Sequence, residues 1–231
     1  MYYGGIAASG MSWIWFLIIP LALGGLAQFW VRSTYTRFSG VPTSTGLSGA
    51  EAARRLLDAE GLDQVTIEMT PGELSDHYDP RSNVLRLSRG VHEGRSVAAA
   101  GVAAHEAGHA IQHARRYVFA TVRTAIVPVA NIGSQAAWIL IPLGLILRMS
   151  GLAWLGVALF GAAVLFQIVT LPVELDASHR ALVALGEYGI LDDVELPGAR
   201  KVLTAAAMTY VVAALISVMY LLRFIGLARR S

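Results

Sequence analysis

Long apolar stretches alternate with polar segments along this chain, and they predict which parts lie in a membrane. A helix crosses a bilayer with about 20 apolar residues. Four windows reach that length: residues 11–31, 125–147, 149–173 and 202–222. Only Arg148 separates the second window from the third, so we expect these two to form a tight helical hairpin. No basic residue precedes the first window, which is longer than a signal-peptide core, so we interpret it as an uncleaved anchor.

The polar segment between the first two windows, residues 32–124, has the pattern of a small α+β unit. Ser48 and Glu51 have the spacing of a capping box, which predicts a short helix that Gly61 ends. Residues 96–113 are rich in alanine and contain no helix breaker, so they predict a helix of about 18 residues. Strands of a β-meander or hairpin are predicted for residues 65–70, 73–78 and 83–88.

These elements together predict a mainly α-helical, multi-pass membrane protein with about four transmembrane helices. Its expected parts are an N-terminal anchor (1–31), an α+β segment (32–124), a transmembrane hairpin (125–173), a second polar segment (174–201) and a last span with a basic tail (202–231). No internal repeat is evident.

Composition and charge support a membrane location and narrow the chemistry. The chain is 55% hydrophobic and 15% charged, whereas soluble domains are about 25% charged. Eighteen basic and sixteen acidic residues are too evenly balanced for a nucleic-acid partner. Fourteen of the basic residues lie in the two polar segments, which predicts that these segments are cytoplasmic. Because there is no cysteine, any metal must be held by His and carboxylate side chains.

The strongest chemical signal is His105-Glu106-Ala107-Gly108-His109 in the alanine-rich helix. The i,i+4 spacing puts both imidazoles on one side of a helix, where they can bind one zinc ion. Glu106 then lies beside the metal, where it can act as general base on a zinc-activated water that attacks a peptide carbonyl. The alternative is a helix whose two histidines bind no metal.

Other zinc arrangements do not fit the residues around this motif. An elongated H-E-x-x-H-x-x-G-x-x-H site would need Gly and His where the chain has Gln112 and Arg115. A motif helix inside the membrane is disfavoured, because Arg95 and Arg116 bracket too short an apolar stretch. His113 continues the i,i+4 series, but three turns of one straight helix cannot converge on one ion, so we expect it not to bind.

The third ligand is expected from a different helix, and Glu174 and Asp176 are the candidates. Pro172 suits a first helical turn or a break at the membrane exit, which would place Glu174 at the cytoplasmic boundary. Two positions apart is about 200° around a helix, so at most one of the two carboxylates faces the metal. The alternative is that both are ordinary acids near a helix start, with Asp176 paired to Arg180.

Several motifs together resemble the bacterial membrane-bound neutral zinc metallopeptidase family typified by YugP, from about residue 46 to the C-terminus. The residues that carry this resemblance are Asp76-His77-Tyr78-Asp79-Pro80-Arg81, Leu87-Ser88, residues 103–112 around the zinc motif, Glu174-Leu175-Asp176-Ala177-Ser178, and residues 206–210. More distantly, the order of strand, H-E-x-x-H helix, transmembrane hairpin and E-x-x-A is similar to the HtpX-type and Ste24-type gluzincins.

The resemblance implies roles for residues outside the zinc motif. Glu174, which opens E-x-x-A, would be the third zinc ligand. Ser178 stands where those gluzincins have Asp, so Asp176 would supply the carboxylate that steadies a metal-binding side chain. An edge strand before the motif helix would pair with extended substrate. The strand residues concerned are Asn83, Leu85 and Leu87.

Three further side chains are candidates to stabilise the oxyanion of the reaction. These are His77 or Tyr78, and separately Tyr210. The alternatives are that His77 only closes a hairpin and that Tyr210 is an interfacial aromatic residue.

We therefore expect an endopeptidase of the inner cell membrane that binds one zinc ion on its cytoplasmic face. Its substrates would be unfolded or membrane-associated proteins. The competing interpretation is a non-catalytic membrane scaffold in which the metal only holds helices together. Glu106 argues against that interpretation, because it has no structural role in a site of two histidines and one glutamate. The sequence gives no indication of the oligomeric state.

Overall fold

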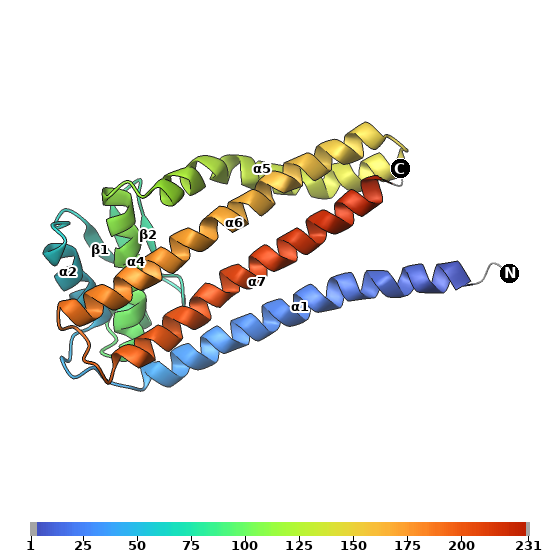
Figure 1. Ribbon diagram of the computed structural model, residues 1–231. Helices are drawn as coiled ribbons and strands as arrows, with labels where there is room; N and C mark the ends of the chain where they lie inside the picture. The colour runs from blue at the N-terminus through green and yellow to red at the C-terminus, as the bar shows by residue number, and fades with distance from the viewer. Residues whose placement is uncertain (1–3, 230–231) are drawn as a thin grey trace. The chain divides into compact units, whose positions relative to one another are not determined.

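The computed structural model describes residues 4–229, and their side chains from residue 14 onward. The ends of the predicted anchor and of the basic tail lie outside this range. The described residues form α1 (Gly4–Ser39), α2 (Gly49–Ala59), β1 (Thr66–Thr70), β2 (His77–Asp79), β3 (Val84–Ser88), α3 (Arg89–His92), α4 (Val97–Ala114), α5 (Val118–Ile146), α6 (Ser150–Glu187) and α7 (Leu196–Ala228) (Figure 1).

Four of these helices are long and apolar enough to cross a bilayer, which confirms the predicted multi-pass, mainly helical architecture. They are the part of α1 from Ile14 to Ser39, and α5, α6 and α7. Each is longer than its predicted window because the helix continues into flanking polar residues. In α6 the helix runs through Pro172 without ending, so the predicted break at that proline is wrong. A proline removes one helical N–H, and the rest of the hydrogen-bond ladder persists on both sides.

The chain divides into two compact units. Unit 1 comprises Met1–Phe29, Arg123–Val169 and Thr209–Ser231, and unit 2 comprises Trp30–Val122 and Thr170–Met208. In unit 1, α5 and α6 form the expected hairpin, with Arg148 at its turn in a left-handed conformation (φ 53°). A Cβ on Gly144 would lie 2.5 Å from the backbone nitrogen of Ala153, so the two helices meet backbone to backbone. Such close contacts through small residues are typical of helix pairs in membranes.

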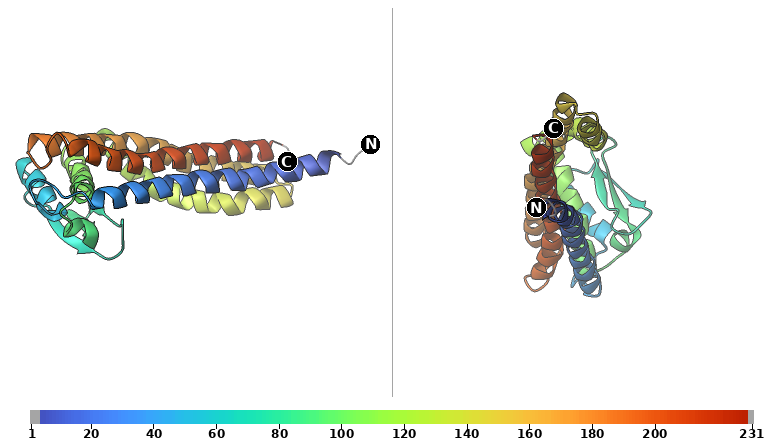
Figure 2. Two further views of the ribbon diagram at one scale, coloured as in Figure 1. Left: turned by 90° about the horizontal axis from the view of Figure 1, so that it is seen from below. Right: turned by 90° about the vertical axis from the view of Figure 1, so that its right-hand side faces the viewer.

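Unit 2 is built around α4. Ser48 and Glu51 form the predicted capping box at the start of α2, and Ser96 caps α4 by accepting a hydrogen bond from the Ala99 N–H. The strands lie together beside α4 (Figure 2). Buried residues of α2, β3, α3, α4, α6 and α7 join in one hydrophobic core. Alanines on most faces of α4 allow neighbouring elements to approach it from several sides.

The three strands form a sheet in the order β1-β3-β2. β2 and β3 are an antiparallel hairpin, whereas β1 pairs parallel to β3. The predicted meander is therefore wrong, and only its hairpin is present. Residues 71–76 explain the difference, because they form an irregular excursion before β2 begins at His77, which leaves β3 between the other two strands.

Candidate metal centre

Two helices of unit 2 bring three metal-ligating side chains together. His105 and His109 lie one turn apart on α4, and Glu174 lies on α6. Glu174 Oε2 is 3.3 Å from His105 Nε2 and 3.5 Å from His109 Nε2. Ligands placed about 2.0–2.2 Å from a tetrahedral zinc ion lie about 3.3–3.5 Å from one another. The donor set and its spacing therefore fit a zinc ion, and they include Glu174, the candidate for the third ligand that the sequence favours.

The three candidate ligands differ in solvent exposure, and solvent can reach the site past the two histidines. The Glu174 side chain is 2% exposed, whereas those of His105 and His109 are 12% and 16% exposed. Among the described residues, these three are the group of His and acidic side chains close enough to share an ion. A carboxylate buried at this depth needs a charged or polar partner. Two imidazoles and a cation would provide it.

The α4 and α6 helices approach each other closely because Gly108 has no side chain. A Cβ at this position would lie 2.8 Å from the Ala177 carbonyl oxygen and 3.3 Å from its Cα. Gly108 immediately precedes His109, and Ala177 is three residues after Glu174. The glycine inside the motif therefore sets the separation of the two ligand-bearing helices.

Glu106 stays outside the ligand set and contacts the sheet instead. Its carboxylate Oε2 accepts a hydrogen bond from the backbone N–H of Tyr78 on β2, at 3.1 Å. The residue is buried beside the two histidines of its own helix. The neighbouring edge strand thus fixes the direction of this carboxylate.

The outer nitrogens of both histidines also have partners. His105 Nδ1 lies 3.1 Å from Ser178 Oγ, and His109 Nδ1 lies 3.0 Å from Gln112 Oε1. Asp176 contacts neither histidine: its carboxylate accepts hydrogen bonds from Gln112 Nε2 at 2.7 Å and from Arg180 Nε at 2.6 Å. Both Nε2 atoms are therefore directed at Glu174, while both Nδ1 atoms are engaged elsewhere.

The structure corrects the strand that was expected to bind substrate. β3 is the central strand, with β1 on one side and β2 on the other, so it has no free edge for another chain. Leu85 and Leu87 are fully buried in the core, and Asn83 accepts a hydrogen bond from the Tyr78 hydroxyl at 2.8 Å. The edge strand near Glu106 is β2, whose Tyr78 N–H donates to that carboxylate. A pattern of apolar residues identifies a strand but not its neighbours.

The oxyanion candidates lie on different elements, His77 and Tyr78 on β2 and Tyr210 on α7. His77 is exposed, is paired across the hairpin with Arg86 and has its Nδ1 2.9 Å from the Ser75 carbonyl oxygen. Tyr78 projects to the opposite face, because side chains alternate along a strand, and its ring lies 6.0 Å from that of His113 on α4. The fold therefore brings Tyr78 toward α4 and does not bring His77 there. Tyr210 lies in unit 1.

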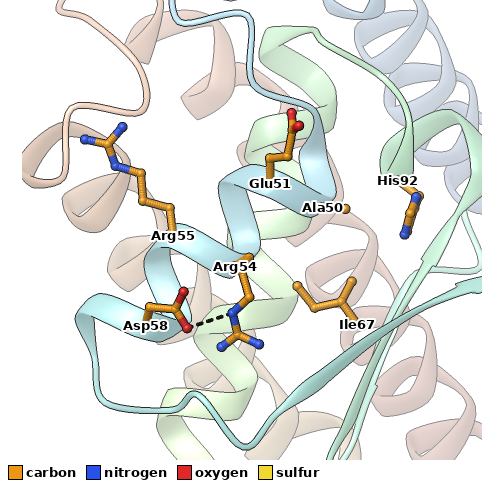
Figure 3. Close-up of a pocket in the computed structure, with 7 residues that line it drawn as sticks. All are labelled: Ala50, Glu51, Arg54, Arg55, Asp58, Ile67 and His92. Carbon is orange, nitrogen blue, oxygen red and sulfur yellow. Dashed lines mark ion pairs between the residues drawn. The ribbon is translucent and has the colours of Figure 1, made fainter.

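A shallow cavity of about 670 Å³ lies elsewhere on unit 2 (Figure 3). Its lining residues belong to α2, β1 and α3: Ala50, Glu51, Arg54, Arg55, Asp58, Ile67 and His92. The Arg54 guanidinium is already occupied by Asp58 and by the carbonyl oxygens of Leu62 and Val65. This cavity contains none of the metal-ligating residues, and Glu51, Arg54 and Asp58 in its lining make contacts within the fold.

Two features of the centre were not identified from the sequence. The first is Gln112, an amide three residues after His109 on the same helix, and this helical spacing is the signal that the sequence offers. The second is the backbone N–H of Tyr78, for which no sequence signal exists, because every residue except proline carries such a group.

An H-E-x-x-H helix, a glutamate from a second helix beside its two histidines, and four helices long enough to cross a membrane are features of a membrane metallopeptidase class. Comparison with known families agrees: residues 13–229 match the family described as "Putative neutral zinc metallopeptidase". The chain belongs to this family. It is also 47% identical over 215 residues to the "Putative membrane protease YugP" of Bacillus subtilis (strain 168), which covers 93% of this chain and 96% of that protein. No solved structure matches the chain.

Proposed function

We propose that the protein is a zinc-dependent endopeptidase in which His105, His109 and Glu174 hold one zinc ion and Glu106 is the general base. The observation that carries this proposal is the convergence of Glu174 Oε2 on the two Nε2 atoms, with Glu106 left free of the ligand set. The match to the zinc metallopeptidase family supports the choice of metal.

The chain's own residues would carry out the proton transfers. When bound, zinc polarises the peptide carbonyl and makes water a stronger nucleophile. Glu106 accepts the proton from the attacking water and then delivers it to the leaving amine. The Tyr78 N–H holds the Glu106 carboxylate in a fixed direction, so little reorientation is needed before the reaction. Tyr210 and Tyr78 remain candidate oxyanion donors, and Tyr78 would have to release its hydrogen bond to Asn83 to act as one.

Substrate recognition is proposed to use the outer edge of β2, where Glu106 already accepts the Tyr78 N–H and the neighbouring main-chain groups would pair with the substrate. An extended peptide can add to an open sheet edge through main-chain hydrogen bonds, which makes recognition tolerant of sequence. Only unfolded or extended segments present such a backbone, so these are the proposed substrates. We further propose that the peptidase is gluzincin-like, with its third ligand, Glu174, on a second helix.

The catalytic segments are proposed to face the cytoplasm. Residues 32–124 and 174–201 carry fourteen of the eighteen basic residues, and basic residues favour the cytoplasmic side of a membrane. The membrane that we propose for this protein is the inner cell membrane of a bacterium.

The decisive experiment replaces Glu106 by Gln in detergent-purified protein. The Glu106→Gln variant should bind zinc stoichiometrically and lose at least about 100-fold in cleavage of unfolded casein, because a positioned base is lost. Glu187→Gln is the matched control, since this side chain is exposed at the end of α6 and should leave both properties unchanged. An active Glu106→Gln protein would refute the mechanism.

A further inference from the structure

We propose that Gln112 is a positioning residue that sets two of the three metal ligands at once. Its amide selects the tautomer of His109 that presents Nε2 to the metal, and it fixes the α6 backbone next to Glu174. This inference rests on the proposed function, because it assigns a role within the same zinc site.

The orientation of the Gln112 amide follows from its surroundings. The side chain is 1% exposed, so water does not satisfy it. Its Nε2 lies 2.8 Å from the Val173 carbonyl oxygen and 2.7 Å from Asp176 Oδ2. A carbonyl and a carboxylate only accept hydrogen bonds, so the NH₂ group must face them. The Oε1 atom must then be the one that faces His109 Nδ1, at 3.0 Å.

This orientation determines where His109 carries its proton. An amide oxygen can only accept, so the neighbouring Nδ1 has to be the N–H donor. In a neutral imidazole the other nitrogen, Nε2, is then unprotonated and free to bind a metal. That atom is the one 3.5 Å from Glu174 Oε2. The Gln112 oxygen therefore presets the histidine for metal binding.

The same amide acts on the third ligand through the backbone. Val173 is the residue immediately before Glu174, and its carbonyl oxygen receives the second Gln112 hydrogen. This hydrogen bond connects α4 to α6 directly beside Glu174. Asp176 holds the amide from the other side, and Arg180 holds Asp176 through its Nε at 2.6 Å. Asp176 thus supports Gln112 and reaches the metal ligand only through it.

His105 lacks an equivalent constraint. Its Nδ1 faces Ser178 Oγ at 3.1 Å, and a hydroxyl can either donate or accept. Ser178 therefore orients the His105 ring without selecting its tautomer. The tautomer constraint in this centre falls on His109, through Gln112.

The first test is Gln112→Met, which keeps the approximate length and volume of the side chain and removes its hydrogen bonds. We expect zinc affinity, measured by chelator competition in detergent, to fall about 10–100-fold. The visible absorption bands of the cobalt-substituted protein should shift. Gln64→Met makes the same change at an exposed position of unit 2 and should alter neither readout. Wild-type affinity and spectrum in Gln112→Met would overturn the proposal.

A charge-swapped pair tests the directed contact. In the Gln112→Glu variant a carboxylate oxygen replaces the NH₂ group opposite Asp176. This variant should therefore bind zinc more weakly than wild type. Adding Asp176→Asn restores a donor opposite that oxygen. We expect the double variant to bind zinc at least about threefold, or about 0.7 kcal/mol, more tightly than Gln112→Glu, and the Asp176→Asn single variant completes the cycle from which the coupling is obtained. If the two changes are instead additive, the Gln112–Asp176 contact does not act on the site.

A wild-type measurement keeps the proposal testable if variants fail to fold. Long-range ¹H–¹⁵N spectra of histidine-labelled, metal-free protein at alkaline pH report which ring nitrogen carries the proton. We expect Nδ1–H for His109, and an Nε2–H tautomer would overturn the proposal. This result is independent of the proposed function. A wild-type protein that binds no zinc would refute the peptidase assignment while leaving the tautomer result to decide the role of Gln112.

Discussion

Replacing Gly108 by Ala should separate the two helices that share the metal. The new Cβ would lie 2.8 Å from the Ala177 carbonyl oxygen, where ordinary contacts begin at 3.4 Å. The obstacle is backbone and cannot rotate away, so α6 has to retreat by about 0.6 Å at this point. Glu174 lies one helical turn earlier and would retreat with it. Metal sites tolerate displacements of about 0.2 Å in ligand distance.

The expected result is a loss of zinc rather than a loss of fold. Overpacking of this kind costs about 1–3 kcal/mol, while an Ala in place of Gly regains up to about 1 kcal/mol of helix propensity. The metal-free Gly108→Ala protein should therefore remain folded but bind zinc at least about tenfold more weakly. Zinc affinity by chelator competition and thermal unfolding in detergent measure the two effects separately.

Gly101 offers a matched control on the same helix. A Cβ there would lie 3.4 Å from Ala199 Cβ and 3.6 Å from its Cα, which is ordinary contact. Gly101→Ala should keep wild-type zinc affinity and unfold at the same or a higher temperature. Equal zinc affinity in Gly108→Ala and wild type would refute the argument that this glycine sets the ligand distance.

Three further predictions concern the third ligand, the topology and a pH effect. Glu174→Ala should be metal-free after dialysis, whereas Asp176→Ala should bind zinc only about 10–100-fold more weakly, and the reverse pattern by metal analysis would exchange their roles. A reporter fused within residues 89–95 should be cytoplasmic, and a signal from the opposite side would invert the topology. Burial raises the pKa of the Asp76 carboxyl above 3.8, despite the hydrogen bonds that it accepts from Ser88. A carboxyl with a raised folded pKa stabilises the fold while protonated and loses that contribution as the pH rises. Thermal unfolding of Asp76→Asn should therefore improve relative to wild type as the pH rises above about 4, and no pH dependence in this difference would contradict the effect.

The parts of the fold that were predicted correctly depend on local patterns. The span helices follow from continuous apolar stretches, and the α2 start follows from Ser48 and Glu51. The zinc motif is equally local, because i,i+4 spacing fixes the relation of His105 to His109 on any α-helix. Glu174 required a distant segment, and it was selected by resemblance to known peptidases.

The parts that were missed depend on which distant segments meet. The period of apolar residues identifies β3 but cannot show that β1 pairs parallel to it, so the sequence alone does not distinguish this central strand from an edge strand. His77 was grouped with Tyr78 because they are adjacent, although neighbours on a strand face opposite ways. The role of Gln112 becomes visible only when Val173 and Asp176 of α6 lie beside it.

The burial of α4 has a consequence for how the protein exchanges hydrogen and metal with its surroundings. Thirteen of its 18 residues are buried, from Val97 to Gln112. Because such a helix cannot open without separating the elements packed around it, its amide hydrogens should exchange with solvent only when the whole unit unfolds. The rate of metal release is not tied to that event, since the exposed edges of His105 and His109 offer a direct path. Amide exchange in α4 would therefore report the global stability of unit 2, while the metal can leave a unit that stays folded.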